Sequence, residues 1–191
     1  MLVTFEGIDG VGKTTQLNLL KEIYKDAIFT KEPGGTKFGE QLREILLNQN
    51  ISFRSEILLF LADRSEHYER VIKPNLGNLI ISDRGFISGV AYAMANDPSL
   101  DIENLMLFNK FALNNDFGSK FVFFKIDEKS LISRLNLRHT SDNIEKRGIK
   151  YLLRVQDYMQ MIFKNSKFNV LEIDANDEIL NIHKKIKEFI G

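Results

Sequence analysis

A phosphate-binding loop motif close to the start of the chain constrains the fold more than any other feature. Residues 7–14 read Gly-Ile-Asp-Gly-Val-Gly-Lys-Thr, which fits the pattern G-x-x-x-x-G-K-[ST]. The apolar run Leu2–Glu6 precedes the motif, and a stretch of helical periodicity near residues 13–25 follows it. In that context the glycines let the main chain turn its amide groups inward at the N-terminus of a helix, where phosphate groups bind. The sequence therefore predicts that the chain begins with a strand, a phosphate-binding loop and a helix.

Short apolar runs alternate with longer stretches of helical periodicity along the rest of the chain. Besides Leu2–Glu6, the runs predicted to be strands are Ala27–Thr30, Leu79–Ser82, Phe121–Ile126 and Asn169–Ile173. Helices are predicted near 13–25, 38–48, 53–72, 87–95, 101–115, 129–137, 143–164 and 178–189. Because the strand runs lack polar alternation, they suit a parallel sheet covered by helices on both faces. Since no linker interrupts the alternation, we expect an α/β fold in one domain over residues 1–191.

Composition excludes several classes of protein. The chain has 26 Lys and Arg against 26 Asp and Glu, so no net charge draws it to a nucleic-acid polymer or an anionic membrane. It has no cysteine, which excludes disulfides and thiolate metal sites, and its 3 histidines lie far apart in the sequence. No secretory signal or membrane-spanning segment is apparent. We therefore expect a cytoplasmic protein with a small anionic ligand.

The loop motif predicts binding of a nucleoside triphosphate with a divalent cation. In this chemistry the lysine, here Lys13, contacts the β- and γ-phosphates, and the hydroxyl of Thr14 ligates Mg²⁺. A second ligand for the metal is expected at the end of a neighbouring strand, where Asp83 follows the run Leu79–Ser82. The residues predicted to bind the triphosphate are Gly7, Ile8, Asp9, Gly10, Val11, Gly12, Lys13, Thr14 and Thr15.

Other nucleotide-binding classes fit the sequence less well. The guanine-recognition motif NKxD is missing, because Asn109–Ala112 lacks its acidic residue, and no DxxG follows a second strand. Asp116–Gly118 reads DFG, but the glycine-rich and HRD motifs of protein kinases are absent. The sequence therefore favours a kinase that acts on a small molecule.

Four segments in a fixed order carry a resemblance to one family. They are FEGIDGVGKTT at 5–15, EPGGT at 32–36, FLADRSEH at 60–67 and DRGFISGVAY at 83–92. With these segments the chain resembles the thymidylate kinases over essentially its whole length. The resemblance implies a P-loop fold with strand order 2-3-1-4-5, transfer of a phosphoryl group from ATP with Mg²⁺ to dTMP, and a homodimer.

The resemblance also assigns roles at the acceptor site. It implies that Phe60 stacks on thymine and that Arg64, one helical turn later, hydrogen-bonds a base carbonyl. Arg84 is implied as the clamp on the acceptor phosphate, and Tyr92 as a contact to the sugar that excludes a ribose 2′-hydroxyl. The remaining residues expected at this site are Glu32, Pro33, Arg43 and Ser88.

A basic segment near residues 134–150 is the expected lid over ATP. Some family members carry an arginine in the phosphate loop, but this chain has Gly10 there, so the lid must supply that charge. Arg134 is expected to bind ATP and Arg138 to act at the transition state, with Asp9 near the transferred phosphate. The basic residues Lys146, Arg147 and Arg154 belong to the same stretch. The chain departs from the family pattern at Lys31, Gly85, Ala93 and Asn143.

Two alternatives stay open at this point. The nearer one is another nucleoside or nucleotide kinase, which would share the donor site but accept a different substrate. The more distant one is a nucleotide-binding switch without phosphotransferase activity.

Overall fold

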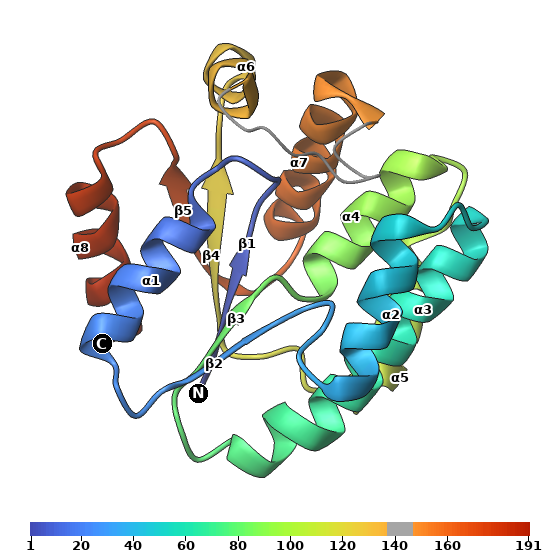
Figure 1. Ribbon diagram of the computed structural model, residues 1–191, viewed down its shortest axis with the longest axis horizontal. Coiled ribbons are helices and arrows are strands. Elements are labelled where there is room, and N and C mark those ends of the chain that lie inside the picture. The colour runs from blue at the N-terminus through green and yellow to red at the C-terminus, as the bar shows by residue number, and fades with distance from the viewer. Residues whose placement is uncertain (137–146) are drawn as a thin grey trace.

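Five parallel strands form the central sheet (Figure 1), in the order β2-β3-β1-β4-β5 that the resemblance implied. The structure is a computed structural model that describes residues 1–136 and 147–191. The strands are β1 (Leu2–Glu6), β2 (Ile28–Lys31), β3 (Ile80–Asp83), β4 (Lys120–Lys125) and β5 (Asn169–Asp174). All five predicted strands are present, with ends displaced by at most one residue. Asp83 is thus the last residue of β3 rather than the first residue after it.

Two helices are shorter than predicted, since the one expected over 101–115 ends at Ala112 and the one expected over 143–164 begins at Ile149, and a third is wrong at its C-terminal end. Otherwise the helices follow the predicted pattern. They are α1 (Lys13–Ile23), α2 (Lys37–Asn48), α3 (Phe53–His67), α4 (Phe86–Asn96), α5 (Ile102–Ala112), α6 (Glu128–Asn136), α7 (Ile149–Lys164) and α8 (Ile179–Ile190). The helix predicted over 53–72 is wrong at its C-terminal end, because α3 passes into a π-helical turn η1 (Tyr68–Ile72) and a 3₁₀ turn η2 (Lys73–Asn75). Pro74 in η2 lacks the N–H that a continuing α-helix needs. Of the helix predicted over 143–164, residues 143–146 lie outside the described ranges.

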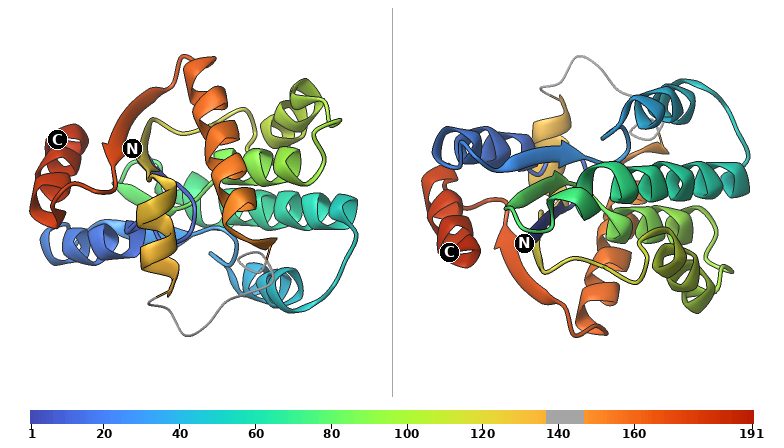
Figure 2. Two further views of the ribbon diagram at one scale, coloured as in Figure 1. Left: turned by 90° about the horizontal axis from the view of Figure 1, so that it is seen from above. Right: turned by 90° about the horizontal axis from the view of Figure 1, so that it is seen from below.

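Helices cover both faces of the sheet, as the apolar strands required. Helices α1 and α8 lie on one face, and α4 and α7 lie on the other, with α3 and α5 packed against α4 (Figures 1 and 2). Every residue of β1 is buried, and Phe5 on β1 and Phe121, Phe123 and Phe124 on β4 are fully buried. This core fixes the carboxyl ends of β1 and β3 side by side at one edge of the sheet, where ligands of parallel sheets bind.

The loop after β2 is packed tightly against α3. A Cβ added to Gly35 would collide with the His67 ring and would lie 2.8 Å from the carbonyl oxygen of Lys31. A Cβ at Gly39, in the first turn of α2, would collide with Asp63 Oδ1. Gly35 and Gly39 therefore have a packing reason, since a side chain at either position would push this segment away from α3.

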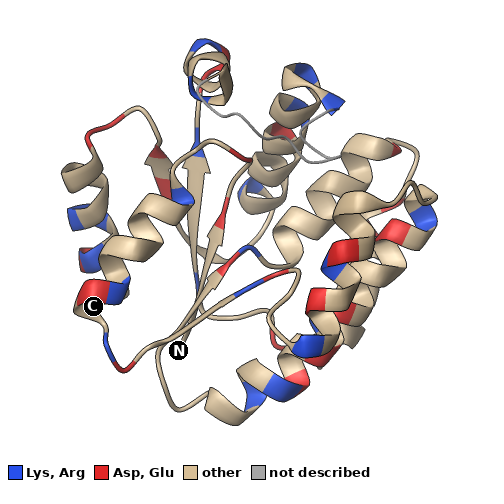
Figure 3. Cartoon of the chain, in the orientation of Figure 1, with Lys and Arg blue, Asp and Glu red and all other residues tan. Residues whose placement is uncertain are grey.

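No helix among the described residues is long and apolar enough to cross a lipid bilayer. Basic and acidic residues are interspersed over the other helices, while α4 carries neither kind (Figure 3).

The close approach of Gly35 to α3 predicts an unequal effect of two alanine substitutions. Gly35→Ala is expected to lower the free energy of unfolding by about 1–3 kcal/mol, because the new methyl group meets a ring and a main-chain oxygen. Gly77 has nothing within 4 Å of its added Cβ, so Gly77→Ala serves as the control. Urea unfolding of both variants measures the difference, and equal stabilities would contradict the packing role of Gly35.

Candidate active site

The main chain of residues 7–12 curls around the N-terminus of α1. Gly12 is the residue before the helix and adopts a left-handed conformation with φ of 96°, and no side chain caps the helix there. Gly7 has φ of +147°, and a Cβ on it would lie 3.0 Å from the Phe124 carbonyl oxygen. Only glycine combines this backbone with this approach. The first amides of α1 therefore face the loop, where they can donate to an anion.

Lys13 lies inside this loop. Its Nζ donates to the carbonyl oxygens of Gly7, at 2.8 Å, and Ile8, at 3.1 Å. Burial lowers the pKa of the Lys13 ammonium to about 8, and the charge of Arg84 acts in the same direction. A buried cation held by its own loop is well placed to meet phosphate oxygens without a change in its backbone.

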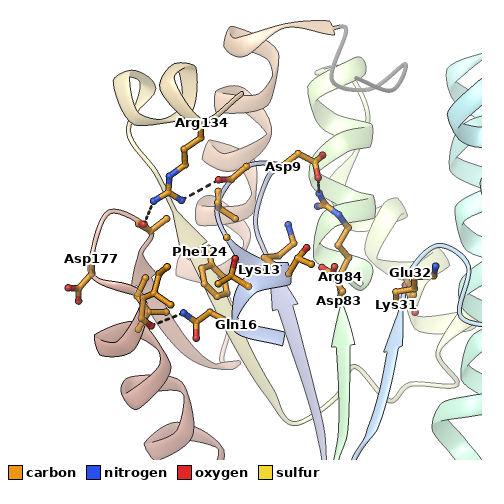
Figure 4. A pocket seen from close by; sticks show the side chains of 18 of the residues that line it. Asp9, Lys13, Gln16, Lys31, Glu32, Asp83, Arg84, Phe124, Arg134 and Asp177 are labelled. Carbon is orange, nitrogen blue, oxygen red and sulfur yellow. Dashed lines mark hydrogen bonds and ion pairs between the residues drawn. The ribbon is translucent and has the colours of Figure 1, made fainter. Parts of the chain in front are cut away.

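A cavity of about 600 Å³ opens above the loop, between α1 and the start of α8 (Figure 4). Arg134 reaches into it from α6 and donates to the carbonyl oxygens of Gly10, at 3.2 Å, and Ala175. A Cβ on Gly10 would lie 3.3 Å from a methyl group of Leu135, so an arginine in the loop at this position would crowd α6. The cation above the loop thus comes from α6.

Arg84, directly after β3, bounds the other side of the loop and is held in a strained backbone conformation. Its φ of 71° is rare for a residue with a side chain. Its guanidinium donates to Gly7 O at 2.8 Å, to Asp9 Oδ1 at 2.7 Å and to Ser88 Oγ at 3.2 Å. Burial disfavours the charge, but the charges of Asp9, Tyr92, Asp83 and Glu6 together outweigh burial and raise the pKa of Arg84. The strain is therefore offset by a set of contacts that fixes one guanidinium orientation.

A second, smaller cavity adjoins the first on the far side of Arg84. Phe60 and Arg64 of α3 line one part of it, and Ser88 and Tyr92 of α4 line another. Asp9, Glu32, Arg43 and Arg84 line both cavities. The two cavities thus meet at the ion pair between Asp9 and Arg84.

Arg64 is fixed by a buried polar network that sequence reasoning did not find. The side chain is 2% exposed and donates to Glu32 Oε2 at 2.8 Å, Asn109 Oδ1 at 2.7 Å and the Gly85 carbonyl oxygen at 3.2 Å. The other oxygen of Glu32 lies 2.9 Å from His67 Nδ1. Although burial opposes it, the charges of Arg64 and His67 lower the pKa of Glu32. The sequence shows the i and i+4 spacing of Phe60 and Arg64. The partners of Arg64, however, come from the loop after β2, from α5 and from the residues after β3.

Three other residues expected at the acceptor site also line the smaller cavity, namely Pro33, Arg43 and Ser88. Arg43 on α2 donates to the Pro33 carbonyl oxygen at 3.1 Å, so its guanidinium adjoins the loop after β2. Ser88 donates to Glu6 Oε2 through a short hydrogen bond and receives one from Arg84. Their roles toward a substrate stay predictions.

Thr14 and Asp83 present oxygen atoms at the rim of the larger cavity. Thr14 is exposed at the start of α1, and Asp83 Oδ1 is buried without a hydrogen-bond partner. Within residues 1–136 and 147–191 no three acidic or histidine side chains gather as a metal site. This donor set fits Mg²⁺, which takes one or two protein oxygens and completes its shell with phosphate and water.

Glu6 was not predicted as a site residue, because in the sequence it is the last residue of an apolar strand. It is fully buried, with Oε1 unpartnered. Burial raises the pKa of Glu6 to about 7, although the hydrogen bond from Ser88 and the charge of Arg84 act against it. A carboxyl group that holds a proton near neutrality therefore lies beneath Arg84 and Ser88.

Of two basic residues of the expected lid, the structure describes Arg147 but not Arg138. Arg138 lies outside the described residues, so its predicted action at the transition state is untested. Arg147 is described, and its guanidinium binds Glu56 on α3 rather than the phosphate loop.

Comparisons with known proteins agree over the whole chain. The family model described as thymidylate kinase matches residues 5–186. Thymidylate kinase of Campylobacter fetus is 61% identical over 192 residues, covering 100% of both chains. Those of Campylobacter curvus and Campylobacter jejuni subsp. doylei are 55% and 52% identical and cover 100% of this chain, with 99% and 100% of their own lengths.

The raised pKa of Glu6 predicts a specific pH dependence of stability. Between about pH 4.5 and 7 the folded state keeps a proton on Glu6 that the unfolded state releases, so the stabilisation from this proton is lost as pH rises. The variant Glu6→Gln has no titratable carboxyl group at this position. Its free energy of unfolding, relative to the native sequence, is therefore expected to rise by about 3 kcal/mol from pH 4.5 to pH 7.5. Urea titrations at several pH values measure the difference, and a constant difference would contradict an elevated pKa.

Proposed function

Because this chain belongs to the thymidylate kinase family, we propose that it transfers the γ-phosphoryl group of ATP to dTMP, which yields ADP and dTDP. The observation that carries this proposal is the pair of cavities that meet at Asp9 and Arg84. One cavity is built around a phosphate-binding loop, and the other has two aromatic rings and three guanidiniums. Two nucleotides bound in them would meet end to end, as direct transfer between phosphates requires.

The larger cavity is the proposed ATP site. The open amides at the start of α1 and the buried ammonium of Lys13 supply fixed positive charge for the β- and γ-phosphates. Arg134, held above the loop, adds a guanidinium from the opposite side. When Mg²⁺ is bound by Thr14 and Asp83, it neutralises charge that develops on the phosphates.

The smaller cavity is the proposed dTMP site. Phe60 offers an aromatic face to the base, and Arg64 keeps hydrogen atoms beyond those it gives to Glu32, Asn109 and Gly85. Arg84 is proposed to hold the acceptor phosphate, whose oxygens are ionised near neutral pH and need no general base. Its contacts to Gly7 and Asp9 orient it before any substrate arrives.

The alternatives are less well supported. A different nucleotide kinase would not account for a match to the thymidylate kinase model over residues 5–186. A switch without transferase activity would have no use for a second cavity that shares Arg84 with the first.

The single domain over 1–191, the lid near 134–150 and the action of Arg138 are part of the proposal. Of these, residues 137–146 lie outside the described ranges, and the case for Arg138 rests on the family resemblance. The cytoplasmic location likewise stays a prediction.

A homodimer is proposed from the family and from an apolar face of α5. Leu107, Phe108 and Phe111 are 58%, 49% and 87% exposed, and their i, i+1 and i+4 spacing puts them on one side of the helix. Large apolar side chains gathered in this way are typical of a surface that another protein covers.

The proposed acceptor site predicts the effect of removing the Phe60 ring. Among dTMP, dUMP, CMP, AMP and thymidine, the native chain with ATP and Mg²⁺ is expected to prefer dTMP. Phe60→Ala is expected to raise KM for dTMP by about tenfold or more, because a stacked aromatic contact contributes on the order of 1 kcal/mol beyond the area it buries. The same substitution is expected to leave KM for ATP unchanged. Phe38→Ala is the control, since Phe38 is exposed and lines neither cavity. A coupled ADP assay measures both constants, and a preference for another acceptor would contradict the assignment.

The apolar face of α5 predicts the oligomeric state. Phe111→Glu puts a charge in the proposed interface, so it is expected to shift a dimer to monomers in sedimentation velocity. An exposed residue elsewhere, Arg70→Glu, is the control and is expected to leave the dimer intact. Identical sedimentation of Phe111→Glu and the native chain would argue against this face.

A further inference from the structure

A group of four side chains ties the start of α7 to α3 and α4, next to the smaller cavity. We call Glu56, Asn96, Arg147 and Tyr151 the brace. Arg147 donates to Glu56 Oε2 at 2.8 Å and to Asn96 Oδ1 at 2.7 Å, so one guanidinium joins the two helices. Glu56 lies on α3 and Asn96 is the last residue of α4.

Tyr151 on α7 completes the brace. Its hydroxyl donates to Asn96 Oδ1 at 2.7 Å and accepts from Arg147 at 2.9 Å, which uses its one hydrogen atom and one lone pair. The ring has the guanidinium of Arg147 at 5.4 Å and that of Arg154 at 5.7 Å from its centre. Ring orientation is therefore fixed at the hydroxyl and supported by cation–π contacts.

The brace is shielded from water, which makes its geometry costly to change. The side chain of Glu56 is 8% exposed and that of Arg147 is 25% exposed. Breaking a charge pair in such surroundings leaves a poorly solvated charge behind. The relative position of α3, α4 and α7 at this point is thus strongly determined.

The brace contacts one wall of the smaller cavity at Tyr92 and lies one helical turn from another wall at Phe60. The ring of Tyr151 lies 6.1 Å from that of Tyr92, measured between centres, and Tyr92 lies one turn before Asn96 on α4. On α3, Glu56 lies one turn before Phe60. Tyr92 is 7% exposed and lines the cavity, with its ring beside the Arg84 guanidinium at 5.7 Å.

We propose that the brace sets the position of the Tyr92 ring and thereby the exclusion of nucleotides that carry a 2′-hydroxyl. This inference rests on the proposed function, in which the base lies at Phe60 and the phosphate at Arg84. The sugar must then lie between them, beside Tyr92. Tyr151 and Arg147 are positioning residues, because they act on the sugar through the Tyr92 ring and touch no substrate.

Three variants separate the parts of this role. Tyr151→Leu removes the ring and hydroxyl, Tyr151→Phe removes the hydroxyl alone, and the double variant Glu56→Gln/Arg147→Met removes both charges so that neither is left unpaired. Lys164→Met is the control, because Lys164 is an exposed cation at the other end of α7, outside the brace and the expected lid. The measurement is kcat/KM for dTMP against ribothymidine 5′-monophosphate, with KM for ATP as an internal reference.

Tyr151→Leu and the double variant are expected to reduce the preference for dTMP by about tenfold, since a wall displaced by a fraction of an ångström admits one extra oxygen atom. Most of the change in kcat/KM for dTMP should fall on KM, with KM for ATP unaltered. Tyr151→Phe should fall between these variants and the native chain, and Lys164→Met should match the native chain.

An unchanged preference in Tyr151→Phe and the double variant, both folded by circular dichroism, would overturn the proposal even if Tyr151→Leu fails to fold. A loss of preference that Lys164→Met shares would overturn it as well, because the effect would then come from removing a positive charge from α7. Failure of the native chain to phosphorylate dTMP would instead contradict the proposed function. In that case the brace is judged by equilibrium binding of the two nucleotides to the same variants.

Discussion

Mutual repulsion between two phosphate-bearing ligands is the constraint on which the rest of the site depends. Bringing them together requires positive charge that is already in place, since mobile side chains would lose entropy on binding. The chain supplies it from fixed groups: the open amides at the start of α1, Lys13 within its loop, and Arg84 locked by Gly7, Asp9 and Ser88. Arg84 is central because it lines both cavities.

Much of the polar structure around the site holds these charges in one orientation. Glu6 lies under Ser88, Glu32 holds Arg64 and approaches His67, and Glu56 holds Arg147. Each carboxyl group is buried. Such groups add little net stability, because the free energy lost in leaving water offsets their attraction. Their contribution is geometric, since a buried network has few alternative arrangements.

The packing of α3 shows how the acceptor side depends on one helix. Its successive turns present Glu56, which binds Arg147 just before α7, Phe60 and Arg64, which line the smaller cavity, and His67, which like Arg64 binds Glu32. The glycine-rich loop after β2 lies against the same helix through Gly35. Any shift of α3 would therefore alter several walls of the cavity together.

The sequence by itself determined the α/β class, the five strands and the phosphate-binding loop, because hydrophobic periodicity and a glycine pattern are local signals. With the family resemblance it also named Asp9, Glu32, Arg43 and Arg84, the residues that the two cavities share. Only the tertiary structure showed that Glu6 is a buried acid, that Arg64 is shared by Glu32 and Asn109, and that Arg147 binds Glu56. These pairings join residues 32 to 91 positions apart. No local pattern encodes such contacts, because burial and charge neighbours arise only when distant strands and helices pack together.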